Sequence, residues 1–132
     1  MTRCPCLSGM PLSECCAPII DGRVTAPTAE RLMRSRFTAF ALGDADYLLK
    51  SWHPTTRPRS LQLDPDLRWY RLDIIGRSKG AFLDTEGTVE FVAHYRSPAG
   101  SGEQHENSRF LRDAGEWRYL AAVGPPAVDM VQ

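Results

Sequence analysis

Residues 4–16 read CPCLSGMPLSECC and contain every cysteine of the chain, namely Cys4, Cys6, Cys15 and Cys16. The segment is too short to bury a core of its own, so the cysteines must decide how it folds. Two close pairs, C-x-C and C-C, are separated by a loop rich in turn residues. Such a loop lets four thiolates converge on one point, as a tetrahedral zinc site requires. The spacing therefore predicts a zinc site with these four ligands.

Disulfides and free thiols are the alternatives to a metal. Cys15 and Cys16 are adjacent, and a bridge between neighbours is strained, so disulfides would have to cross between the two pairs. Met1 is followed by Thr2 and Arg3 with no apolar leader, from which we expect a cytoplasmic protein. Because a reducing compartment disfavours disulfides, the sequence favours zinc.

The rest of the chain is large enough for one ordinary domain. With 132 residues, we expect a metal knuckle over residues 1–22 and a second domain over residues 23–132. Sixteen basic and sixteen acidic residues cancel, which argues against nucleic acid as a general partner. No apolar run reaches the ~18 residues that suggest a membrane span.

Two helices are expected after the knuckle. From Thr28 to Leu42 apolar residues recur at helical spacing, and Gly43 supplies a C-terminal stop. Asp44 can cap a second, shorter helix that ends before Pro54. Both helices precede all of the expected strands.

In the second half of the chain, apolar and polar residues alternate with a period of two. Strands are expected over residues 69–75, 88–96, 106–112 and 117–123, the last two joined by a tight turn at 113–115. Gly76 to Gly80 is expected to form a turn. Helices followed by antiparallel strands predict an α+β domain with the helices packed on one sheet face.

The segment Cys4-Pro5-Cys6-Leu7-Ser8-Gly9, followed by Cys15-Cys16, resembles the SEC-C zinc motif. The motif is best known from a protein-translocation ATPase, where it binds zinc and contacts an export chaperone and lipid. The resemblance implies a zinc cofactor and a protein partner bound through the knuckle. The family's usual stretch has glycine where this chain has Leu7, and a positive φ there would make leucine costly.

A wider resemblance covers about residues 4–120. The segments 26–30 (APTAE), 32–37 (LMRSRF), 47–48 (YL), 52–54 (WHP) and 105–110 (HENSRF) resemble the bacterial YchJ family, also called UPF0225. The resemblance implies an NTF2-like (cystatin-type) cone, in which helices lie against a strongly curved antiparallel sheet. It implies no particular activity.

Four polar residues are the candidates for a ligand site inside such a cone: Arg36, His53, His94 and Arg109. Arginines and histidines together would favour an anionic small molecule, because guanidinium groups pair with carboxylate or phosphate. The alternative is that these residues form salt bridges or helix caps at the rim of a filled cone.

Two function classes follow. The first is a zinc-binding interaction or small-ligand-binding module. The second is a small-molecule enzyme of the hydratase or isomerase kind, which rests on fold analogy and needs a histidine and a carboxylate facing the cavity. Neither a phosphate loop nor a nucleophile elbow is present in the sequence.

Overall fold

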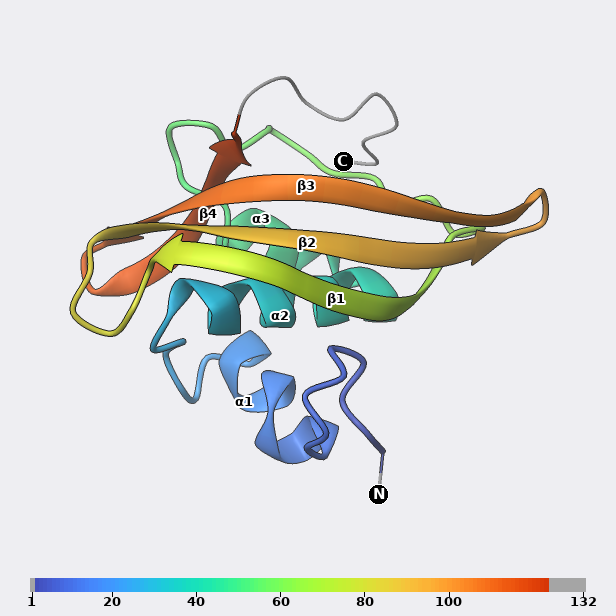
Figure 1. Ribbon diagram of the computed structural model, residues 1–132, viewed down its shortest axis with the longest axis horizontal. Coiled ribbons are helices and arrows are strands. Elements are labelled where there is room, and N and C mark those ends of the chain that lie inside the picture. The colour runs from blue at the N-terminus through green and yellow to red at the C-terminus, as the bar shows by residue number, and fades with distance from the viewer. Residues whose placement is uncertain (1, 124–132) are drawn as a thin grey trace.

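The computed structural model describes residues 2–123, in which a four-stranded sheet covers one side of two helices (Figure 1). The strands are β1 (Arg68–Lys79), β2 (Glu86–Ser97), β3 (Gly100–Asp113) and β4 (Glu116–Ala122). They follow one another in the order β1-β2-β3-β4, with each neighbouring pair antiparallel. The α+β class and the four strands expected from the sequence are confirmed.

The helices α2 and α3 begin within one residue of their expected starts, and the expected stop at Gly43 and cap at Asp44 are both present. Helix α2 (Ala29–Leu42) starts where the Thr28 side chain accepts a hydrogen bond from the Arg31 amide, and it ends at Gly43 with φ +74°. Helix α3 (Ala45–Lys50) starts where the Asp44 side chain accepts from the Tyr47 amide. Side-chain oxygens at these positions satisfy amides that have no partner within the helix.

The N-terminal segment forms a separate layer on the side of α2 that faces away from the sheet (Figure 1). It contains a short 3-10 turn, η1 (Leu12–Glu14), and the helix α1 (Cys16–Ile20). Ile19 nevertheless belongs to the same core cluster as Leu32 and Leu48, so the knuckle adds to the main core. None of the helices in residues 2–123 has the length and apolar character to cross a bilayer.

Alternation along the strands decides which side chains face α2. On β2, Val89, Phe91 and Ala93 are buried, while the residues between them are half-buried on the outer face. The register shifts between Trp69 and Arg71 and again between Ile74 and Gly76. Such bulges bend a strand and increase its twist, which curves the sheet around the helices.

The expected turn from Gly76 to Gly80 is wrong for most of its length. Strand β1 continues through residue 79, where Lys79 still pairs with Gly87 of β2. The chain leaves the strand only at Gly80, whose carbonyl accepts a hydrogen bond from the Ala29 amide at 3.0 Å. This bond fixes the start of α2 against the β1–β2 hairpin.

The contact between the two strands at this hairpin leaves no room for a side chain. A Cβ added to Gly87 would lie 2.4 Å from the Gly80 Cα, whereas a Cβ added to Gly76 would meet nothing within 4 Å. We therefore expect Gly87→Ala to lower the free energy of unfolding by about 1–3 kcal/mol, the usual range for overpacking. Gly76→Ala on the same pair of strands is the control and should change it by less than about 0.5 kcal/mol. Urea denaturation of both variants measures the difference, and equal midpoints would contradict the close packing.

Candidate functional site

The four cysteines of the knuckle are brought together by a short backbone hairpin and by α1. The Cys4 amide donates to the Met10 carbonyl at 2.9 Å, which folds the first pair back over the loop. The 3-10 turn η1 then leads directly into Cys15 and Cys16, at the start of α1. All four cysteine side chains are buried.

The sulfur atoms have the spacing of a tetrahedral metal site. All four Sγ atoms lie within 4.8 Å of one another. The Cys6–Cys15 distance is 3.6 Å and the Cys15–Cys16 distance is 3.9 Å. A tetrahedron with Zn–S bonds of ~2.3 Å has sulfur–sulfur edges of about 3.8 Å. All four cysteines are free of disulfides, so the residues present fit a four-thiolate metal centre.

Without a cation the cluster cannot carry four negative charges. Hydrogen bonds from the Cys16 and Cys6 thiols lower the pKa of Cys4. The same contact with Cys4 raises the pKa of Cys16, and burial raises the pKa of Cys15. The protein therefore stabilises one thiolate at the expense of its neighbours. A divalent cation removes this conflict, because it stabilises all four deprotonated sulfurs.

Helix α2 holds the knuckle through polar side chains on its outer face. Arg34 Nη1 donates to the Cys6 carbonyl at 2.8 Å, and Arg31 Nη2 donates to the Cys15 carbonyl at 3.3 Å. The Thr38 hydroxyl lies 3.5 Å from Cys4 Sγ. Contacts of this kind orient metal ligands and are part of how a protein tunes a metal site.

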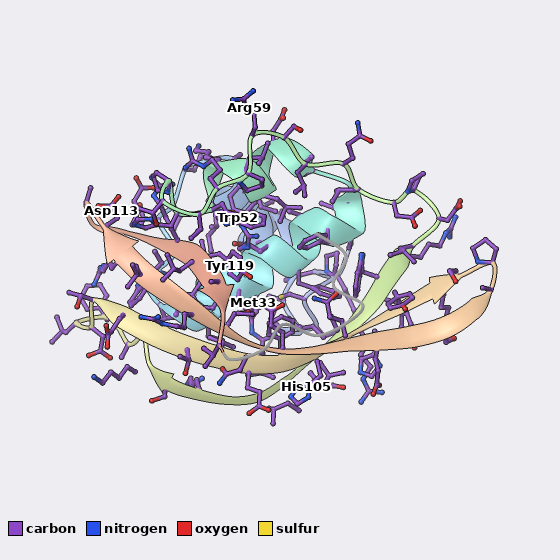
Figure 2. The ribbon with its side chains drawn as sticks, turned by 90° about the horizontal axis from the view of Figure 1, so that it is seen from above. Met33, Trp52, Arg59, His105, Asp113 and Tyr119 are labelled. Atoms are coloured by element: carbon purple, nitrogen blue, oxygen red, sulfur yellow. The ribbon has the colours of Figure 1, made fainter. Side chains whose placement is uncertain are left out.

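A second candidate site is the cavity between α2 and the inner face of the sheet. Its volume is about 30 Å³, and it is partly open to solvent. Its apolar wall consists of Met33, Phe37, Phe40, Trp69, Phe91 and Ala93. Its polar wall consists of Arg36, Gln104, Glu106, Ser108 and Tyr119. Met33 and Tyr119 can be followed between the helices and the sheet in Figure 2.

Arg36 is the one residue of the four sequence candidates that lines this cavity. Its side chain is 3% exposed. Nη1 donates to the Leu48 carbonyl at 2.8 Å and to Ser51 Oγ at 2.7 Å, both at the end of α3. The guanidinium also lies over the rings of Trp52 and Tyr119. Burial lowers the pKa of Arg36 to about 10, so it stays protonated at neutral pH.

Glu106 is the carboxylate of the cavity, and it is 6% exposed. Its Oε2 accepts hydrogen bonds from the Ser108 hydroxyl and, at 3.1 Å, from the Tyr119 hydroxyl. Its Oε1 accepts a longer bond from Gln104 at 3.4 Å. Burial, followed by the nearby Glu106 carboxylate, raises the pKa of Tyr119. Tyr119 is thus a hydrogen-bond donor at neutral pH.

The other three candidates lie away from the cavity. His53 is half-buried, and its Nδ1 lies 2.7 Å from the Thr55 hydroxyl in the loop after α3. His94 is on the outer face of the sheet, where its Nε2 lies 2.9 Å from Asp73 and lowers the pKa of that carboxyl. Arg109 is exposed.

The expected grouping of Arg36, His53, His94 and Arg109 therefore needs correction, since only Arg36 lines the cavity. The reason is strand alternation. His94 follows cavity-lining Ala93, and Arg109 follows cavity-lining Ser108, so both side chains point to the opposite face. The outer face also carries His105, which projects away from the helices in Figure 2 and lies 2.6 Å from Glu90.

Three polar residues of the cavity, Gln104, Glu106 and Ser108, were missed by the sequence analysis. The alternation along β3 could have identified them, because they lie on the same face of the strand as Phe110, which is fully buried. Counting back from Phe110 in steps of two gives the three positions. A buried polar residue on an otherwise apolar face is more informative than the exposed His105 beside it.

Comparison with known proteins agrees with both parts of this architecture. Residues 28–122 match the family model described as YchJ, middle NTF2-like domain. A UPF0225 protein of Corynebacterium glutamicum is 50% identical over 117 residues, which cover 89% of this chain and 93% of the relative. A UPF0225 protein of Streptomyces coelicolor is 49% identical over 116 residues, covering 88% and 90%.

Two solved structures share the fold. A SEC-C motif containing protein from Rhodopseudomonas palustris matches with a TM-score of 0.80 and 29% identity, covering 94% of this chain and 99% of that one. A SEC-C motif containing protein from Psychrobacter arcticus matches with a TM-score of 0.73 and 26% identity, covering 95% and 84%. The expected NTF2-like domain is confirmed, and this chain belongs to the YchJ (UPF0225) family.

Proposed function

We propose that Cys4, Cys6, Cys15 and Cys16 hold one zinc ion with a structural role. The observation that carries the proposal is the close approach of the four buried sulfurs, at distances a tetrahedral zinc site requires. Four protein ligands close the coordination sphere, and a closed site leaves no position for a reacting water. Four free cysteines also agree with a cytoplasmic location, which we include in the proposal.

The knuckle presents an apolar tip that suits a protein partner. Leu7 is 54% exposed and Met10 is 39% exposed, on the loop between the two cysteine pairs. Leu7 has φ +63°, a conformation that is unfavourable for any residue with a Cβ. Strain of this kind is tolerated where a residue has a use, so we propose that the tip contacts a partner protein.

The cavity is proposed to bind a small molecule. Two buried charged side chains, Arg36 and Glu106, line a partly open space that is otherwise mostly apolar, which is the usual anatomy of a ligand site. The protein would then act as a binding module with a metal-stabilised knuckle and a separate ligand cavity.

The alternative, an enzyme of the hydratase or isomerase type, has less support. Glu106 and Tyr119 are a carboxylate and a hydroxyl within hydrogen-bond distance in the cavity, which is the observation in its favour. However, none of the three histidines, all of which lie in the described part of the chain, lines the cavity. The histidine–carboxylate pair that this alternative needs is therefore missing.

The zinc proposal predicts the metal content of the purified protein. Protein prepared without chelator should contain about one zinc per chain, because one tetrahedral site takes one ion. Elemental analysis measures the ratio, and Cys6→Ser is the variant that should lose most of the metal. Metal-free protein with crossed disulfides in its mass spectrum would contradict the proposal.

Removal of the metal should disorder the knuckle and leave the second domain folded. Residues 2–18 contribute little to the apolar core, whereas the sheet and α2 form a core of their own. In two-dimensional NMR spectra, chelator should reduce the chemical-shift dispersion of the amides of residues 2–18. It should also shift the signals of Arg34 and Thr38. Signals from β2 and β3 should stay in place, and their collapse would show that the fold depends on the metal as a whole.

Relief of the backbone strain at Leu7 should strengthen the metal site. Leu7→Gly removes the Cβ at a position with positive φ, and we expect a gain of about 1 kcal/mol, or roughly fivefold in zinc affinity. Leu7→Ala is the matched control, since it removes the leucine side chain but keeps the Cβ, and it should gain nothing. Competition with a chromophoric chelator gives both affinities. Equal gains would mean that the side chain, and not the backbone conformation, weakens the site.

A further inference from the structure

The charges that line the cavity are balanced. Arg36 supplies one positive charge, and Glu106 supplies one carboxylate. The two groups interact electrostatically across the cavity but form no direct ion pair in the described structure. An anion placed there would approach Glu106, and a cation would approach Arg36. The sequence predicted an anionic ligand because two arginines and two histidines were expected to face the cavity. Of these four residues, only Arg36 lines it.

Some N–H donors of Arg36 form no hydrogen bond within residues 2–123. Its Nη1 donates hydrogen bonds to the Leu48 carbonyl and to Ser51 Oγ, both at the end of α3. Within residues 2–123, neither Nε nor Nη2 has a hydrogen-bond partner. A guanidinium carries five N–H donors, so a buried arginine that uses only one nitrogen is ready to donate to an acceptor in the cavity. This is an unpartnered polar group in a side chain that is 97% buried, since Arg36 is 3% exposed.

One carboxylate oxygen of Glu106, Oε1, can accept a further hydrogen bond. Two hydroxyl donors, from Ser108 and Tyr119, both bond to Oε2. From the residues that the structure describes, Oε1 receives only the 3.4 Å bond from Gln104. A carboxylate oxygen accepts about two hydrogen bonds, so Oε1 can take a further donor.

The remaining wall restricts the shape of a ligand. Phe37, Phe91 and Tyr119 are buried around the polar groups, whereas Phe40 and Trp69 are the half-buried lining residues. The cavity therefore opens beside Phe40 and Trp69. The cavity volume of about 30 Å³ is two to three times what one water needs, roughly 10–15 Å³. A small polar head fits inside, and a flat ring attached to it would lie at the opening, beside the Phe40 and Trp69 rings, whose centroids are 6.0 Å apart.

We propose that the cavity binds a small, flat, neutral molecule with a hydrogen-bond acceptor beside a donor, of which a carboxamide is the simplest case. The carbonyl oxygen accepts from the free donors of Arg36, and the amide N–H donates to Glu106 Oε1. The proposal rests on the proposed ligand-binding function of this cavity and names the class of ligand that it selects.

Three isosteric probes test the selection for charge. Benzamide, benzoate and benzamidinium have the same ring and the same shape, but they are neutral, anionic and cationic. Titration of the full-length, metal-loaded protein, followed by NMR, should give a Kd for benzamide on the order of 1 mM, with both charged probes at least about tenfold weaker. The shifts should centre on the amides of β3 from residue 104 to 108.

A variant of Glu106 supplies an independent test. Glu106→Gln keeps the shape but removes the carboxylate, so Arg36 is left as the charge of the cavity and benzoate should overtake benzamide. The ratio of the Kd for benzamide to the Kd for benzoate should change by at least about tenfold. Glu103→Gln is the matched control, because Glu103 lies on the opposite face of the same strand and should leave the preference unchanged.

The outcomes separate the ligand class from the ligand-binding function. If benzoate or benzamidinium binds the unmodified protein as tightly as benzamide, the neutral class is wrong while small-molecule binding stands. If Glu106→Gln leaves the order of affinities unchanged, Glu106 does not select the ligand and the class is likewise overturned. If none of the three probes shifts the β3 signals, both the class and the proposed ligand-binding function fail.

Discussion

The buried guanidinium of Arg36 joins three parts of the fold, namely α2, the end of α3 and β4. It extends from α2 to the end of α3, where Nη1 donates to the Leu48 carbonyl and to the Ser51 hydroxyl, and it lies 5.2 Å from the ring centre of Trp52 and 4.6 Å from that of Tyr119. A charge taken out of water is tolerated only when its surroundings compensate for the lost hydration. Carbonyl, hydroxyl and aromatic faces supply that compensation here. The position of α3 over the sheet therefore depends on a charge.

Helix α2 separates two polar systems with different chemistry. Its outer face holds the cysteine knuckle through Arg34 and Thr38, and its inner face lines the cavity with Met33 and Arg36. Residues three and four apart lie on one face of a helix, so a short run of sequence serves both systems. One helix therefore carries both sets of contacts, and the core that α2 forms with the sheet keeps the cavity wall in place.

Local signals made much of this fold predictable. The stop at Gly43 and the cap at Asp44 placed the helices to within one or two residues, and the cysteine spacing indicated the metal site, because these signals depend on neighbours in sequence. The composition of the cavity was harder to predict. Periodicity showed that His94 and Ala93 lie on opposite faces, but only the packing of α2 decides which face is inside. Bulges in β1 change the phase again, and the sequence carries no clear mark of them.

The protonation states of the cavity favour binding over proton transfer. General acid–base catalysis works best when a group titrates near the working pH. Burial lowers the pKa of Arg36 only to about 10, and it raises the pKa of Tyr119, so both keep their protons at neutral pH. They act as donors, and Glu106 accepts from Tyr119 and Ser108. Fixed donors and acceptors around a small, mostly apolar space are typical of a binding site, which agrees with the ligand-binding function proposed for the cavity.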